Sequence, residues 1–230
     1  MHRILVTIIS AVASCALSVS AGNAGIMAHA GSDESGALDR LVFAMASSSV
    51  TFDYTYRLTP VSGPVLSGTG SVRFQGNSFI MKGNGLEIYC DGKCRWTIDR
   101  SAREAVAESF DAGHPDYLAN PALILGNITD AFELEPGQSD SAAADEITLV
   151  PAADMGQISS VRLSFSPEIS VSASGASFRA PSRVVLGMHD GSVMDMTISG
   201  FGIASAEEDT SRYSFDETGL GDDYIVTDLR

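Results

Sequence analysis

The sequence predicts a mainly β protein with a few helices (α+β), built on one large, strongly curved antiparallel sheet. Residues 51–58 alternate without a break between apolar and polar side chains, which is the period of a strand with one buried face. Similar segments recur about every ten residues between turn signals, a spacing typical of an antiparallel meander. A sheet of roughly ten twisted strands must curl or close. We therefore expect a curved sheet, preceded by one amphipathic helix and interrupted mid-chain by short helices.

The remaining strands are expected wherever the alternation returns. They are residues 71–75, 79–81, 86–88, 95–99, 103–108, 147–150, 161–165, 183–187, 192–200, 213–215 and 224–226. No internal repeat or linker divides this series.

Two helical regions are expected to cap the concave face of the sheet as a lid. In residues 35–48 apolar side chains recur at helical spacing and form one stripe. A second region, residues 114–126, has Pro121 at a plausible first helical position. Helix stripes that cannot be buried on each other must be buried on the sheet. The predicted lid residues are Leu38, Leu41, Met45, Leu118, Leu123 and Leu125.

The apolar face of the first strands is expected to line a cavity for a small apolar ligand, because strict alternation places side chains of one parity on one face. The predicted lining residues are Phe52, Tyr54, Tyr56, Phe74, Phe79, Met81, Trp96 and Ile98. A charge at Phe79 or Met81 is expected to abolish ligand binding and leave the protein folded. The alternative is a filled core.

Residues 1–30 are typical of a secretory signal peptide. A basic start, His2-Arg3, precedes a short apolar run at residues 4–13, too short for the roughly 20 residues of a spanning helix. Small residues predict cleavage after Ala21 or Ala30. The remaining domain, residues 31–230, is expected to be soluble in the bacterial periplasm.

A lipid anchor at Cys15 is the alternative. Residues 12–15, Val-Ala-Ser-Cys, read as a lipobox with Cys15 as the lipidated residue. The residues that follow, 16–21, stay small and apolar, which extends the signal and favours the soluble product.

The net charge of −15 excludes one class of partner. Such a surface repels phosphate backbones, and no basic cluster overrides it, so the protein is not expected to bind nucleic acid. Anionic lipid headgroups are not attracted by long-range charge either. Any lipid binding must therefore rest on apolar burial. We also expect the protein to be a monomer.

Cys90 and Cys94 flank a predicted hairpin turn at Asp91-Gly92. A three-residue loop would bring the two cysteines face to face and permit a disulfide, whereas a two-residue loop would stagger them. Both a disulfide and two free thiols remain open. A lone C-x3-C is a poor metal site because zinc takes four ligands, so no metal or cofactor is expected.

No arrangement of residues predicts catalysis. The sequence lacks G-x-S-x-G, S-x-x-K, H-E-x-x-H and a P-loop. His114 and His189 both fall in predicted surface turns. We therefore expect a binding protein and not an enzyme.

In order and spacing, these segments resemble a divergent branch of the outer-membrane lipoprotein carrier (LolA-like) family. The resemblance covers nearly the whole mature chain. It rests on the helix and strand of residues 38–58, the glycine-led strand 68–74, the hairpin 88–96 with its D-G-K-x-x-W turn, the N-P-x-x-L-L of residues 120–125, the strand 147–151, residues 213–216 and the ending 226–230.

The resemblance implies an unclosed β-barrel lidded by helices, whose cavity takes the acyl chains of a lipoprotein in transit between membranes. The implied partners are acylated lipoproteins, an inner-membrane releasing complex and an outer-membrane acceptor. Family members carry a lid-locking Arg-Pro where this chain has Gln75-Gly76-Asn77, and Arg73 or Arg57 is expected to substitute. The alternatives are a lipid-anchored outer-membrane acceptor or a lipid-sensing envelope domain of the same fold.

Overall fold

The computed structural model describes residues 36–46, 48–111, 123–126, 128–153, 156–172, 175–207 and 209–230. The predicted signal peptide, Cys15, His114, Leu118 and Pro121 lie outside these residues. Among the described helices, none has the length and apolar character needed to cross a membrane.

Within the described residues, twelve strands form one sheet in the order β12-β6-β5-β4-β3-β2-β1-β11-β10-β9-β8-β7. The strands are β1 Ser48–Thr59, β2 Leu66–Gln75, β3 Ser78–Gly83, β4 Leu86–Asp91, β5 Cys94–Asp99, β6 Glu104–Ser109, β7 Phe132–Leu134, β8 Glu146–Pro151, β9 Ile158–Val171, β10 Ser177–Met188, β11 Val193–Ser205 and β12 Ile225–Leu229. The helices are α2 Ala37–Met45, α3 Leu123–Gly126, α4 Ile128–Ala131 and the 3-10 turns η1 Ser211–Tyr213 and η2 Glu217–Gly219.

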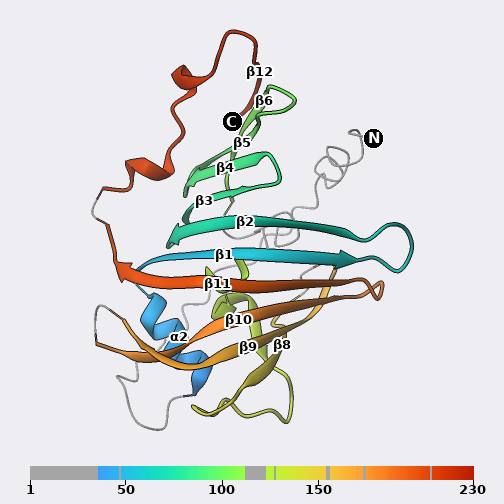
Figure 1. Cartoon of the computed structure of the whole chain (residues 1–230), viewed down its shortest axis with the longest axis vertical. Coiled ribbons are helices and arrows are strands. Elements are labelled where there is room, and N and C mark those ends of the chain that lie inside the picture. The colour runs from blue at the N-terminus through green and yellow to red at the C-terminus, as the bar shows by residue number, and fades with distance from the viewer. Residues whose placement is uncertain are drawn as a thin grey trace.

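The sheet is curved and does not close, because its edge strands β12 and β7 do not pair with each other. Figure 1 shows the strands rotating progressively from β12 to β8, with α2 against the sheet near β9 and β10. The predicted fold class, an unclosed antiparallel barrel with an N-terminal helix and short mid-chain helices, is confirmed.

The inner face of the sheet, defined as the face that contacts α2, carries the main hydrophobic core. Across neighbouring strands Val50 pairs with Phe74, Phe74 with Phe79, and Phe79 with Cys90. All four are buried in one cluster with the apolar stripe of α2. The helix packs on β10 and on the start of β1, so its stripe is buried by the sheet as its periodicity predicts.

A bulge bends the sheet where β1 meets β11. Thr51 pairs with Gly202 and Asp53 with Ser199, so Phe52 opposes two residues, Gly200 and Phe201. Gly200 adopts φ 61°, a left-handed conformation that glycine takes without steric cost. The ring of Phe201 stacks on Phe52, with centroids 6.1 Å apart. The bulge thus adds curvature and a second aromatic ring to the core.

The C-terminal strap, described at residues 206–207 and 209–230, crosses the opposite, outer face of the sheet. It begins at Glu207, whose backbone exchanges two hydrogen bonds of 2.9 Å with the side chain of Gln75. Phe215 then packs on Tyr89 and Trp96, with ring centroids 5.2 and 5.4 Å away. The strap ends in β12, which pairs with β6 in parallel. Such a pairing needs a crossover connection, and the strap is the last part of the connection that leads from β6 to β12.

The strap corrects one strand prediction. Residues 213–215 were expected to form a strand, but Tyr213 closes the 3-10 turn η1. The carboxylate of Asp209 accepts a 2.8 Å hydrogen bond from the backbone amide of Ser211, a local bond that favours a turn over an extended strand. Tyr213 is completely buried against β3 and β4.

Candidate functional site

The inner face of β1 to β3 is the candidate ligand-binding surface. Of the predicted lining residues, Phe52, Tyr54, Phe74, Phe79 and Met81 lie on this face with exposures of 1–8%. Tyr56 lies on the same face and is half-buried. These side chains pack with α2 in a continuous core. A ligand on this surface must therefore displace packed side chains.

Trp96 and Ile98 were assigned to the wrong face. The β4–β5 loop holds only Gly92 and Lys93, and Cys90 pairs with Arg95. Arg95 and Thr97 therefore continue the inner face, since side chains alternate along a strand. Trp96 and Ile98 form a second cluster with Ala105, Ala107 and Phe215 on the outer face, under the strap. The apolar part of the inner face consequently ends at β4.

The same two-residue loop keeps Cys90 and Cys94 apart, and the structure has both as free thiols. Cys90 lies on the inner face beside Phe79 and is fully buried, whereas Cys94 contacts the outer cluster. The disulfide left open by the sequence is therefore not formed, because the stagger turns the two side chains to opposite faces. Burial raises the pKa of the Cys90 thiol to about 11, so this thiol stays protonated and unreactive at neutral pH.

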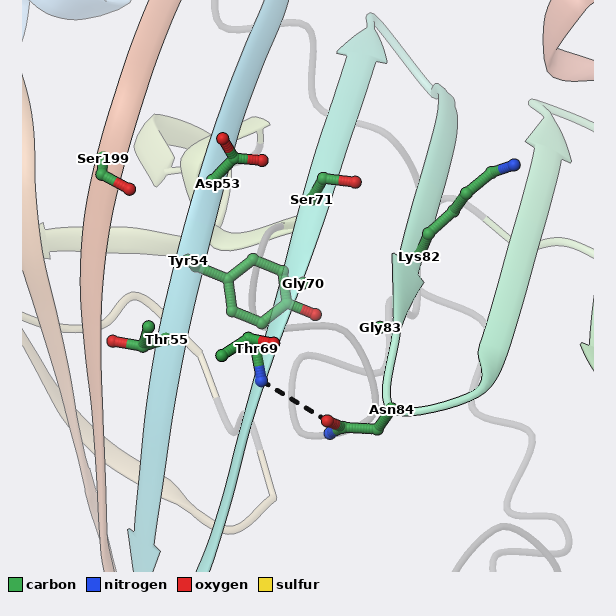
Figure 2. A pocket seen from close by; sticks show the side chains of 10 residues that line it. All are labelled: Asp53, Tyr54, Thr55, Thr69, Gly70, Ser71, Lys82, Gly83, Asn84 and Ser199. Atoms are coloured by element: carbon green, nitrogen blue, oxygen red, sulfur yellow. Dashed lines mark hydrogen bonds between the residues drawn. The ribbon is translucent and has the colours of Figure 1, made fainter.

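Two tyrosines of β1 pair with the two glycines of β2. Tyr54 pairs with Gly70 and Tyr56 with Gly68. A side chain at Gly70 would collide with the ring of Tyr54, which lies across the strand in Figure 2. Burial, followed by the charge of Tyr56, raises the pKa of Tyr54 to about 12. Glycine at position 70 leaves room for the ring of Tyr54, and glycine at position 68 leaves room for the side chain of Asn84. Tyr54 is buried, whereas Tyr56 is half-buried.

An open hollow of about 510 Å³ lies at the same place (Figure 2). Besides Tyr54 and the glycines, its lining is polar: Asp53, Thr55, Thr69, Ser71, Lys82, Asn84 and Ser199. Most of these side chains lie at outer-face positions of their strands. A polar, open lining does not suit an acyl chain, so we place the candidate site on the inner face.

Lid helix α2 is held at its N-terminus by Asp140. The backbone amides of Leu38 and Asp39 donate to the Asp140 carboxylate at 3.1 and 3.2 Å. A side chain at Gly36 would collide with this carboxylate. Asp140 thus satisfies amides that a helix start leaves unpaired. Sequence reasoning missed Asp140, because it stands 102 residues from Leu38 in a small-residue loop with no capping signal.

The structure describes the side chains of four predicted lid residues. Leu38, Leu41, Met45 and Leu125 are buried in the main core. Leu123 begins α3, but its side chain is outside the described part of the chain. Within the described ranges, no group of three or more His, Cys, Asp and Glu side chains is placed to hold a metal ion.

Comparison with known proteins gave matches only among solved structures. No family model matches the sequence, and no curated protein matches it. LolA-like proteins are among the solved matches. A LolA superfamily protein from Nitrosomonas europaea is 15% identical, with 83% of this chain and 100% of that chain covered and a TM-score of 0.41.

Two further solved structures match at similar levels. A putative outer membrane lipoprotein-sorting protein domain from Vibrio parahaemolyticus is 8% identical, covers 76% of this chain and 95% of its own, and has a TM-score of 0.40. An uncharacterized conserved protein from Thermus thermophilus is 12% identical, covers 83% and 96%, and has a TM-score of 0.46.

Neither arginine expected to replace the LolA-like lid lock points toward the lid. Arg73 lies on the outer face, where its guanidinium contacts the Glu207 carboxylate of the strap at 3.1 Å. Arg57 is exposed on the outer parity of β1. The parity of each strand excludes the predicted role, because α2 lies on the inner face.

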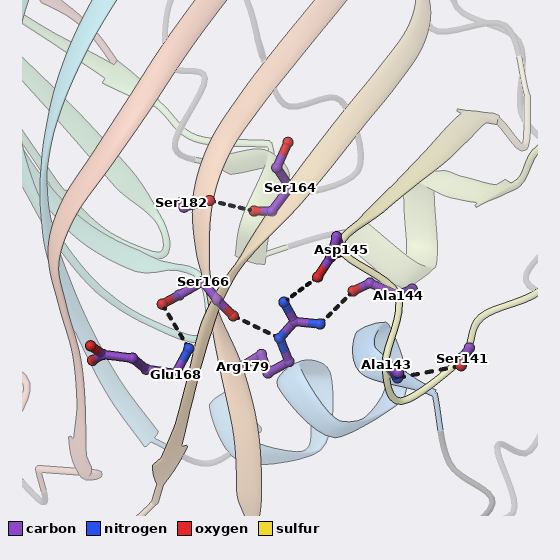
Figure 3. Close-up of polar contacts among 9 residues, drawn as sticks. All are labelled: Ser141, Ala143, Ala144, Asp145, Ser164, Ser166, Glu168, Arg179 and Ser182. Carbon is purple, nitrogen blue, oxygen red and sulfur yellow. Dashed lines mark hydrogen bonds and ion pairs between the residues drawn. The ribbon is translucent and has the colours of Figure 1, made fainter.

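Arg179 fastens the loop that carries Asp140. Its guanidinium donates to the backbone oxygens of Ser166 and Ala144 at 2.6 and 2.8 Å, and to the Asp145 carboxylate at 2.7 Å (Figure 3). Its side chain is only 11% exposed. The loop between β7 and β8 is thereby tied to β9 and β10 at Arg179 and to the lid helix at Asp140. The lid contact thus rests on a short chain of polar bonds.

Replacing Asp140 with alanine is expected to lower the free energy of unfolding by roughly 0.5 to 2 kcal/mol, the usual effect of losing a helix N-cap acceptor. Asp140→Asn keeps an acceptor and should lose less. Urea unfolding followed by circular dichroism measures both, with the exposed Asp222→Ala as control. Equal stability of Asp140→Ala and Asp222→Ala would show that the cap does not hold the helix.

Proposed function

We propose that the mature chain is a periplasmic, non-enzymatic carrier that binds the acyl chains of lipoproteins on its inner face and takes them toward the outer membrane. The observation that carries the proposal is a lid helix whose apolar stripe covers the same face that a ligand would use. A lid held by exchangeable apolar contacts and one polar cap suits reversible loading. An inner-membrane releasing complex and an outer-membrane acceptor are the proposed donor and recipient.

The energetics of exchange support this proposal. Acyl burial contributes about 0.8 kcal/mol per CH₂ group, so a chain with a dozen buried methylenes gives roughly 10 kcal/mol. Withdrawing Leu38, Leu41 and Met45 from the core would cost about 1.5 to 3 kcal/mol for each side chain. The ligand can therefore offset the loss of the lid contacts, and binding is favourable without any charge on the face.

Native mass spectrometry of the protein purified from the cell envelope tests the proposal. Co-purifying acylated peptides are the expected result. A protein that purifies without any bound acylated peptide and takes up no fluorescent fatty acid in solution would rule the carrier out.

Leu58 offers the cleanest variant for the acyl site. It continues the inner parity of β1 but is only half-buried, so a polar residue there spares the core. Leu58→Gln is expected to weaken fluorescent fatty-acid binding about tenfold, equivalent to about 1.4 kcal/mol. The control is Val226→Gln on β12, which is 45% exposed and pairs with the outer-face residue Ala105. Equal loss in both variants would contradict an inner-face site.

A lipid-anchored acceptor or lipid-sensing domain is the second candidate, favoured by the lipobox at Cys15. An acyl anchor would fix the protein to one membrane, whereas a shuttle has to leave it. Metabolic labelling with a fatty-acid probe separates the two. Label that disappears in Cys15→Ser would establish the anchor and replace the soluble carrier.

A further inference from the structure

Four apolar side chains are exposed together at the turns of two hairpins. Val61, Val65 and Leu66 belong to the β1–β2 hairpin, and Val193 follows the β10–β11 turn, with exposures of 68%, 45%, 39% and 39%. We call these four residues the apolar tip. Both turns project from the same side of the sheet, away from α2 (Figure 1).

The two turns are joined to each other. β1 and β11 pair as far as Thr59 and Val193, and the backbone amide of Val61 donates to the hydroxyl of Ser192 at 3.3 Å. Ser192 in turn donates from its amide and hydroxyl to the Asp190 carboxylate at 2.8 and 3.0 Å. The tip is therefore a built surface with its backbone fixed, which lowers the ordering cost of binding.

Charge and composition indicate what this surface fits. Residues 58–67 carry no charged side chain, although the chain has a net charge of −15. They also include none of the aromatic or Arg residues that anchor protein partners. Aromatic and Arg side chains dominate the binding energy of protein–protein interfaces, so a protein partner is disfavoured. Because this chain is acidic, an anionic lipid surface would repel it. A neutral, zwitterionic lipid surface matches the four apolar side chains of the tip, because the carboxylate in its second turn, Asp190, is bonded to the amide and hydroxyl of Ser192.

The tip also continues the inner face. Leu58 pairs with Leu66 on one side and with Met194 on the other. Tyr54 is buried, whereas Tyr56 and Leu58, which lie nearer the turn, are half-buried. Apolar side chains thus run without interruption from the core to the exposed turn.

We propose that the apolar tip inserts into a zwitterionic lipid surface, so that the protein docks with the open end of its inner face against the bilayer. Docking is independent of what the inner face carries. Only the corollary that acyl chains pass over the tip rests on the carrier function proposed above.

Vesicle flotation of the mature chain tests the docking. The double variant Val61→Asp/Val65→Asp is compared with Ile169→Asp/Val171→Asp on β9. The control residues are 72% and 66% exposed and lie toward the other end of β10 from its turn with β11. With phosphatidylcholine vesicles, the wild type and the control variant should bind alike and the tip variant at least tenfold more weakly. Val61→Ser/Val65→Ser, which adds no charge, should fall between them.

Equal vesicle binding by the wild type and both tip variants would overturn the proposal, as would binding that requires phosphatidylglycerol. So would loss of a protein partner with vesicle binding unchanged. Fluorescent fatty-acid binding in solution separates this proposal from the carrier function. The tip variant should keep that affinity, and a wild type that docks on vesicles but takes up no fatty acid would refute the carrier and leave the tip standing.

Discussion

Replacing Phe79 with glutamate is expected to unfold the chain and not merely to empty a binding site. Phe79 is 1% exposed, and its ring meets that of Phe110 edge-on at 5.7 Å. Burying an unpaired carboxylate costs several kcal/mol, a large part of the roughly 5 to 15 kcal/mol that stabilises a domain. The sequence had suggested that a charge here would spare the fold, and the observed burial contradicts that expectation.

Circular dichroism and urea titration measure this effect, with Phe79→Leu as the control. Leucine keeps the site apolar and should cost roughly 1 to 2 kcal/mol through the cavity that it leaves. A Phe79→Glu protein with a native spectrum and an unchanged unfolding midpoint would mean that Phe79 faces an accessible space. In that case the half-buried Leu58 would no longer be the better probe of ligand binding.

Truncating Tyr213 to alanine is expected to release the C-terminal strap. Its side chain is completely buried, and removing a large buried ring typically costs about 3 to 5 kcal/mol. The strap is the cover of Trp96, which is the chain's single tryptophan and is 5% exposed. The fluorescence of Trp96 therefore reports on the strap and on the outer cluster beneath it, and a red shift should precede unfolding of the main core.

Tyr213→Phe is the matched control. The Tyr213 hydroxyl is buried and has no hydrogen-bond partner among the described residues. Deleting an unsatisfied hydroxyl should leave stability unchanged or raise it by up to about 1 kcal/mol, because no desolvated polar group then remains. A clear loss in Tyr213→Phe would show that the hydroxyl does have a partner. An unshifted Trp96 emission in Tyr213→Ala would show that Tyr213 does not hold the strap over Trp96.

Local alternation was sufficient to predict most of the sheet. The unbroken period of residues 51–58 placed Phe52, Tyr54 and Tyr56 on one face, and the structure keeps them there. The stripe of Leu38, Leu41 and Met45 likewise predicted the covered side of α2. Both patterns are local. They predicted the buried side correctly because each element buries only one of its faces.

The errors arose where a turn or a distant segment decides the outcome. Trp96 and Ile98 keep perfect alternation, but one residue more or less in the loop after Asp91 exchanges the faces of β5. Asp140 gains its role from a helix 102 residues away. The parallel pairing of β12 depends on the path of the strap over Trp96. No local pattern encodes such relations.

The pairing of β1 with both β2 and β11 has a kinetic consequence. Val61 and Ser192 are 131 residues apart, so β1 receives its second neighbour only after most of the chain is available. Long loops must close before such contacts form, which slows folding. During synthesis the nascent chain therefore remains without its completed barrel wall until β11 has been made. Because this topology delays folding, it would keep the chain in the unfolded state that a secretion channel requires.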